Sequence, residues 1–225
     1  MNDRSNFITF HKKDFTIEQI KNSCEGFEVF ICEITNNGND HINEYVFIYP
    51  EENEKKNFPD SSNNLAEIIS KKLHISALWV FFWETSICVS VHSNGKLDSF
   101  FERNYSDIIY DWWGITNEQE EERQIKAKER KKNYLKKEKV LNISSLSKVY
   151  PKIDKSKNID IDGGNELLFD PGNLEKALNI PSDLFYNHFG CFVDFFANEQ
   201  KNKSYKISHN LSEQRYIRHQ KNINY

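Results

Sequence analysis

The alternation of hydrophobic and polar positions predicts a β-sheet in the first hundred residues. Five segments have the β-branched and aromatic residues or the two-residue periodicity that strands favour: 27–34, 44–49, 77–84, 86–92 and 97–102. Residues 77–84 are apolar at almost every position, which is typical of a central strand covered on both faces. In that strand Trp79, Phe81 and Trp83 would share one face, because successive side chains point to opposite sides.

Turn and helix signals connect these strands. The sequences Asn36–Asn39 and Ser93–Lys96 favour the left-handed backbone conformations of hairpin turns. Thr16 and Gln19 form the pattern of a capping box at the start of a helix. A second helix is predicted over 63–74 from apolar residues three or four positions apart. The predicted fold class is therefore α+β: an antiparallel sheet of about five strands with packed helices.

The second half of the chain is predicted to be mainly helical. The predicted elements, in chain order, are helices over 105–114, 117–139, 170–178 and 181–198, a strand over 205–208 and a helix after residue 211. The chain then divides into an α+β sheet module (1–115), a charged helical connector (116–140) and a mainly helical C-terminal module with a basic tail (141–225). One continuous domain is the alternative.

Charge is distributed unevenly along the chain. The overall net charge is only −4, but residues 1–122 contain 22 acids and 10 bases, a net charge of −12. Residues 123–139 contain nine bases and two acids, and residues 200–225 contain six bases and one acid. The sequence therefore predicts an acidic body with two basic appendages.

The hydrophobicity pattern predicts a soluble, cytoplasmic protein. The longest apolar run, from Ala77 to Trp83, is far shorter than the roughly 20 residues of a membrane span. The first residues have no basic segment followed by an apolar one, as a secretory signal would. The cysteines are far apart in the sequence and are expected to be reduced and mostly buried: Cys24, Cys32, Cys88 and Cys191.

Few residues suggest catalysis. His188, Cys191 and Asp194 would lie at i, i+3 and i+6 of the predicted last helix, so a Cys–His pair is possible. This pair supports one alternative function, a hydrolase. The surrounding phenylalanines favour a buried, structural Cys191 instead. No phosphate loop, dinucleotide fingerprint or helical zinc spacing occurs, so we expect no cofactor, no metal site and a non-enzymatic role.

The acidic body favours a protein that binds a basic protein partner. Acidic surfaces steer and complement basic partners, and Trp and Tyr are enriched at interface hot spots. The predicted partner-binding residues combine carboxylates with two consecutive tryptophans: Glu51, Glu52, Glu54, Asp60, Asp107, Asp111, Trp112 and Trp113.

In general style the chain resembles the small immunity proteins of bacterial toxin–immunity pairs. The resemblance rests on the acidic α+β body and on the strands Trp79–Glu84 and Ser86–Phe101 around Asn94-Gly95. It implies a cytoplasmic inhibitor that occludes a cognate toxin, often a basic one because such toxins attack nucleic acid. No diagnostic motif accompanies it, so it assigns no role to a particular residue.

The basic segment 123–139 supports a further alternative, a regulatory protein associated with nucleic acid. Its phosphate-binding residues would be Lys131, Lys132, Lys136 and Lys137. Aromatic residues are sparse in that segment, so base stacking would be weak. The acidic body would also oppose an extended nucleic-acid interface.

Overall fold

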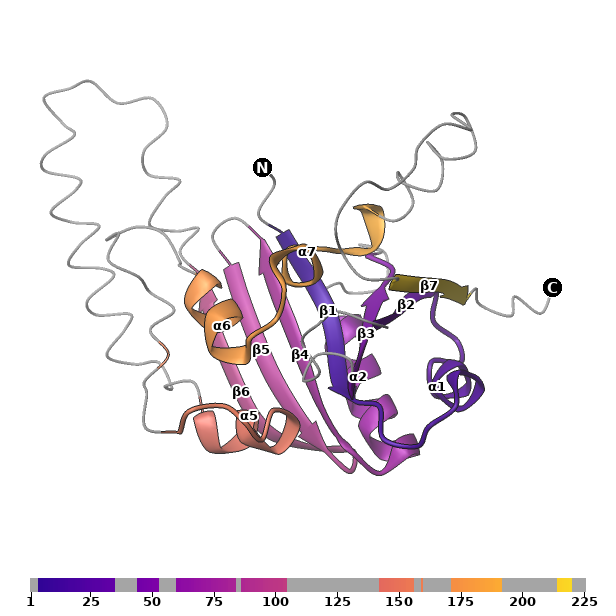
Figure 1. The fold of residues 1–225 in the computed structure, drawn as a ribbon, viewed down its shortest axis with the longest axis horizontal. Helices are drawn as coiled ribbons and strands as arrows, with labels where there is room; N and C mark the ends of the chain where they lie inside the picture. The colour runs from indigo at the N-terminus through magenta and orange to yellow at the C-terminus, as the bar shows by residue number, and fades with distance from the viewer. Residues whose placement is uncertain are drawn as a thin grey trace, which may run out of the picture.

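A seven-stranded antiparallel sheet forms the centre of the molecule (Figure 1). The computed structural model describes residues 4–34, 44–52, 60–83, 86–104, 142–155, 159, 171–191 and 214–219. The strands are β1 (Arg4–His11), β2 (Val29–Ile34), β3 (Tyr45–Pro50), β4 (Ser76–Trp83), β5 (Ser86–Ser93), β6 (Lys96–Asn104) and β7 (Gln214–His219). Their order across the sheet is β6-β5-β4-β1-β3-β2-β7.

Helices cover both faces of this sheet. They are α1 (Ile17–Ser23), α2 (Asp60–Leu73), α5 (Ile143–Val149), α6 (Pro171–Leu178) and α7 (Ser182–Phe185). The first two pack on one face, here the α1–α2 face, and the other three pack on the opposite, α5–α7 face (Figure 1). The α+β class with a helix-packed antiparallel sheet is therefore confirmed.

Several local predictions are confirmed. The Thr16 hydroxyl accepts a hydrogen bond from the backbone N–H of Gln19 (3.2 Å), and the Gln19 side chain accepts one from the Thr16 N–H (2.8 Å), which completes the capping box. Asn94 and Gly95 have φ angles of 52° and 76°, the left-handed conformations that a two-residue hairpin requires. The strands β2 and β3 are paired as predicted, although the turn at 36–39 lies outside the described residues.

The predicted faces of β4 are also confirmed. Trp79 and Phe81 lie in the core under α1 and α2, and Val80 and Phe82 lie in the core under α5–α7. Every residue from Ala77 to Phe82 is buried. The strand is therefore covered on both sides, as its continuous apolar sequence predicts.

The central strand was not predicted. Residues 4–11 form β1, which lies fourth of the seven strands and pairs with both β3 and β4. Phe7 packs on the α5–α7 face, whereas Ile8 and Phe10 pack on the α1–α2 face. Asn6 and Thr9 are polar but buried, so the strand lacks a clean alternation of apolar and polar residues.

Two predictions for the C-terminal half are wrong. The helix predicted over 181–198 is not continuous: α7 ends at Phe185, the chain turns at residues 186–188, and helical structure resumes over 189–191, where this described segment ends. Residues 214–219, predicted as part of a helix, form β7 and pair with β2 from Val29↔His219 to Ile34↔Gln214. This pairing satisfies backbone groups of β2 that would otherwise lie at an open edge, which is a non-local reason for a strand. The helices predicted over 105–114 and 117–139 and the strand at 205–208 lie outside the described residues.

The C-terminal helices share a hydrophobic core with the N-terminal strands. Tyr150, which follows α5, stacks on Tyr45 of β3 with ring centroids 4.5 Å apart and an interplanar angle of 5°. Its hydroxyl is 3.0 Å from the Thr9 hydroxyl of β1. The Tyr45 hydroxyl donates to the backbone carbonyl of Val149 (3.0 Å). Residues of the predicted first and third modules are thus in direct contact, while the predicted domain boundaries themselves remain a prediction.

Replacement of Tyr150 measures how far α5 stabilises the sheet. Tyr150→Ala should lower the free energy of unfolding by about 3–5 kcal/mol, because it removes a fully buried ring from the core. Tyr150→Phe should cost about 1 kcal/mol, because it removes only the contact with Thr9. Urea denaturation followed by tryptophan fluorescence and circular dichroism measures both. Loss of α5 with no change in the unfolding of the sheet would contradict a shared core.

A buried polar cluster attaches α2 to β5. The Asn63 side-chain oxygen accepts a hydrogen bond from the Ser90 hydroxyl (2.6 Å) and lies 2.8 Å from Nε2 of His92. Nε2 must therefore carry the proton, and the buried Nδ1 of His92 has no hydrogen-bond partner within the described residues. Burial lowers the pKa of His92 from its ordinary value of 6.5, against a weaker opposing effect of Glu67.

The cluster predicts a loss of stability in weak acid. Because the pKa of His92 is lower in the folded state, the unfolded chain binds more protons just below pH 6.5, and the free energy of unfolding falls as the pH drops through that window. His92→Gln keeps a polar side chain there but cannot be protonated, so its stability should fall less between pH 6.5 and 5. The matched control is His11→Gln, at a half-buried histidine. Equal pH dependence in wild type and His92→Gln would refute this assignment.

Candidate functional site

The segment after α7 is bound to the start of the central strand. β1 and β3 are paired only as far as Ile8↔Ile48, so β1 has no β3 partner nearer its start. There the backbone N–H of Asn6 donates to the carbonyl of Asn187 (3.1 Å). The C-terminal segment therefore lies against β1 where the two strands have separated, next to the loop that follows β3.

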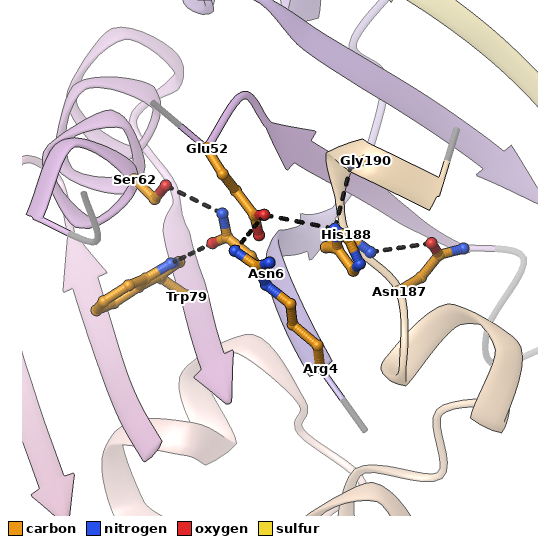
Figure 2. A network of polar contacts seen from close by, with 8 residues as sticks. All are labelled: Arg4, Asn6, Glu52, Ser62, Trp79, Asn187, His188 and Gly190. Carbon is orange, nitrogen blue, oxygen red and sulfur yellow. Dashed lines mark hydrogen bonds and ion pairs between the residues drawn. The ribbon is translucent and has the colours of Figure 1, made fainter. Parts of the chain in front are cut away.

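Asn6 connects three elements below this crossing (Figure 2). Its side chain is fully buried. Its oxygen accepts a hydrogen bond from the Trp79 indole N–H on β4 (3.1 Å), and its amide donates to the Ser62 hydroxyl on α2 (3.3 Å). Because Asn6, Trp79 and Ser62 are all buried, these two hydrogen bonds fix β1, β4 and α2 relative to one another.

A chain of charged residues lies beside Asn6. Oε2 of Glu52 is 2.5 Å from a guanidinium nitrogen of Arg4 and 3.4 Å from Nδ1 of His188 (Figure 2). The Glu52 side chain is only 11% exposed, so this carboxylate is screened by little water. The Arg4 guanidinium also lies over the Trp83 ring, 4.4 Å from its centroid. The residues come from β1, the loop after β3, the end of β4 and the segment after α7.

The chain of charges ends at an exposed thiol. The backbone N–H of Cys191 donates to the carbonyl of His188 (3.2 Å), a turn that places the two side chains together. Their hydrogen bond lowers the pKa of Cys191, against an opposing effect of burial. Burial lowers the pKa of His188, but its hydrogen bonds to Cys191 and Glu52 outweigh burial and raise the pKa to about 9. Both shifts favour a thiolate next to an imidazolium.

Nδ1 of His188 has two neighbours that it cannot satisfy together. Glu52 requires a proton on Nδ1, whereas the backbone N–H of Gly190, 3.2 Å away, requires a lone pair there. The raised pKa of His188 selects the protonated form, so the contact with Glu52 holds at neutral pH. The carboxylate thus orients the ring that faces Cys191.

This arrangement corrects the sequence-based picture of Cys191. The thiol was expected to be buried among phenylalanines, but it is exposed because α7 stops before it. The pair with His188 forms where the chain enters a new helical segment at 189–191, not within one continuous helix from residue 181. The carboxylate that contacts His188 is that of Glu52, which lies 136 positions earlier in the chain. The spacing of residues along one helix could not indicate this contact. Asp194 lies outside the described residues.

A second feature is an exposed surface beside α2. The exposed large apolar side chains of the described residues are Trp83 (43%), Leu97 (55%) and Phe100 (37%). By strand register, Phe100 and Glu102 of β6 lie opposite Ser90 and Cys88 of β5, on the α1–α2 face. Asp60, the first residue of α2, and Glu102 are both exposed. We define the acidic–aromatic surface as Asp60, Trp83, Leu97, Phe100 and Glu102.

The two carboxylates of the acidic–aromatic surface, Asp60 and Glu102, both act on the same buried thiol. The pKa of the buried Cys88 is raised to about 12, mainly by burial and in smaller part by the negative charges of Glu102 and Asp60. Both carboxylates therefore lie around the same position of the sheet. β6 is an edge strand of the described sheet, and its apolar side chains Leu97 and Phe100 are exposed.

The predicted partner-binding residues are only partly described. Asp60 is exposed, Glu51 is half-buried, and Glu52 is held by Arg4 and His188, so Glu52 cannot offer a free carboxylate. Glu54, Asp107, Asp111, Trp112 and Trp113 lie outside the described residues, as do Lys131, Lys132, Lys136 and Lys137. Sequence reasoning missed Glu102 and Phe100; the signal was their spacing of two on a predicted strand, which puts them on one face.

The described residues contain no group of three or more potential metal ligands. None of the helices in the described ranges is long and apolar enough to cross a membrane. Comparison of the chain with protein-family models, with curated proteins and with solved structures found no match.

The shared carboxylate should be important for stability. Glu52→Gln should lower the free energy of unfolding by about 1–3 kcal/mol, because it removes the charge that balances a mostly buried Arg4 and His188. Glu67→Gln, the same change at an exposed position of α2, should cost less than about 0.5 kcal/mol and serves as the control. Urea denaturation at pH 7 compares the two. Equal losses would mean that the contacts of Glu52 make no net contribution to the free energy of unfolding.

Proposed function

We propose that this protein is a cytoplasmic inhibitor that binds a basic protein partner, in the manner of an immunity protein that neutralises a toxin. The observation that carries the proposal is the acidic–aromatic surface. Its exposed apolar side chains, on β4 and the edge strand β6, and its carboxylates, on β6 and at the start of α2, lie on the α2 side of the sheet. This is the composition of an interface in which an apolar centre is surrounded by charge.

The side chains of this surface suit a docking role. Trp83 is held by the Arg4 guanidinium over its ring, so the indole needs little ordering on binding. Phe100 and Leu97 project from a strand, whose backbone is fixed by the pairing with β5. Preorganised aromatic and aliphatic groups lose little entropy in a complex, which favours tight binding.

The negative charge of the N-terminal part of the chain supports the proposal that the partner is basic. Residues 1–122, which include the whole acidic–aromatic surface, have a net charge of −12. Such a charge accelerates association with a positively charged protein and disfavours association with nucleic acid. The carboxylates Asp60 and Glu102 would then contact lysine or arginine side chains of the partner.

Affinity capture with matched charge variants tests the proposal. The tagged full-length protein is incubated with a lysate of its own host at moderate salt, and retained proteins are identified by mass spectrometry. We expect one stoichiometric basic protein with wild type, and at least a tenfold loss of affinity for the purified partner with Glu102→Lys or Phe100→Ser. The control Asp14→Lys makes the same charge change in the exposed turn beyond the opposite end of β1.

The salt dependence of binding distinguishes this surface from others. Affinity of the wild-type protein for its partner should fall as salt rises, and Glu102→Lys should make that slope shallower. Equal binding of wild type, Glu102→Lys and Phe100→Ser would reject the acidic–aromatic surface as the interface. Retention of nucleic acid alone would instead favour the alternative that uses the lysines of 123–139.

A further inference from the structure

The four cysteines fall into two chemical groups. Cys24, Cys32 and Cys88 are buried, and burial raises the pKa of Cys24 and of Cys88 to about 12. Cys191 alone among them is exposed, and it alone adjoins a histidine that is itself held by a carboxylate. Three buried thiols in the same chain are therefore internal references for the reactivity of the fourth.

The surroundings of Cys191 come from three separate segments. His188 faces the thiol, Glu52 holds His188, and Arg4 holds Glu52 (Figure 2 shows the last three). The charged groups acting on the thiol are His188, which lowers its pKa, and Glu52, which raises it less. Each of these residues is fixed by a contact to the sheet or to its loops, so the positive charge stays beside the sulfur atom.

We propose that Cys191 is a nucleophilic thiolate that exchanges with low-molecular-weight disulfides of the glutathione type. The Cys191 sulfur attacks one sulfur of the disulfide, and a new S–S bond forms as the old one breaks. The electron pair of the broken bond leaves with the second sulfur, which takes a proton from water. Cys191 is oxidised to a mixed disulfide, and the departing thiol is reduced.

The exposure of Cys191 suits exchange with a small disulfide. Acyl transfer would also need N–H donors directed at a developing oxyanion. The N–H of Cys191 itself is not available for that role, because it donates to the carbonyl of His188. Thiol–disulfide exchange needs only a thiolate and access to it, and both conditions are met at this exposed cysteine.

The pH profile of alkylation in the wild-type protein is the first test. The native full-length protein is treated with iodoacetamide between pH 6 and 8, and modification of each cysteine peptide is timed by mass spectrometry. An ordinary thiol with a pKa of 9.0 should react about 100-fold more slowly at pH 6 than at pH 8, because its thiolate fraction falls by that factor. Cys191 should slow by clearly less than this factor, because its pKa is lowered by His188, and the three buried cysteines should stay unmodified.

Variants show whether His188 and Glu52 are positioning residues for the thiol. His188→Gln should restore the steep, ordinary pH profile and slow alkylation more at pH 6 than at pH 8, because the thiolate fraction at pH 6 falls. Glu52→Gln tests whether the carboxylate acts through His188: loss of its hold on the ring should steepen the profile, whereas loss of its own negative charge near the thiol would flatten it. The controls His11→Gln and Glu51→Gln should leave the profile unchanged, and circular dichroism checks that every variant is folded.

Glutathione disulfide tests the proposed exchange itself. At pH 6.5 the wild-type protein should form one mixed disulfide, located at Cys191, and dithiothreitol should reverse it. The proposal that Cys191 is a thiolate would be overturned if its alkylation rate in the wild-type protein fell about 100-fold from pH 8 to 6. It would also be overturned if His188→Gln left the pH profile of that rate unchanged. Fast alkylation of Cys191 without formation of a mixed disulfide would overturn the proposal that disulfides react with this thiolate. None of these outcomes depends on partner binding, so the inference stands or falls separately from the proposed function.

Discussion

Burial of both faces of the central strands is the constraint on which the rest of this structure depends. β1, β3 and β4 are buried along nearly their whole length, so a helical layer on one face alone would leave a broad apolar surface in water. Helices α1 and α2, inserted between strands, cover one face. Within the described part of the chain, the opposite face is covered by α5, α6, α7 and the residues next to them, all from beyond residue 142. The two ends of the chain must therefore fold together.

The polar groups at the start of β1 are a consequence of the same packing. Once the C-terminal segment crosses the sheet, its backbone and side chains need partners away from water, and Asn6 and Glu52 provide them. Arg4 links the two candidate regions, because its guanidinium binds Glu52 and also lies over Trp83. The thiol environment and the acidic–aromatic surface are thus connected through one residue. A partner that contacts Trp83 would lie close to the charges that set the state of Cys191.

Local sequence signals predicted the fold class well and the candidate sites poorly. The capping box at Thr16, the turn at Asn94-Gly95 and the two-sided burial of β4 depend on neighbours within a few residues, and all three are confirmed. β1 escaped prediction because its buried Asn6 and Thr9 interrupt the apolar pattern; each is satisfied by a distant residue, Ser62 or Tyr150. The Glu52–His188 contact joins residues 136 positions apart, which no periodicity encodes.

The sequence by itself determined the strands β2 to β6, the first two helices and the acidic character of the N-terminal body, because these follow from local hydrogen bonding, side-chain periodicity and charge. Only the tertiary structure decided that β1 is central, that residues 214–219 pair with β2, and that α7 stops at Phe185. It also decided that Cys191 meets His188 at the surface while Glu52 holds the ring from another loop. These outcomes depend on which distant surfaces and unpaired backbone groups must be covered together, and that requirement exists only when the whole chain is assembled.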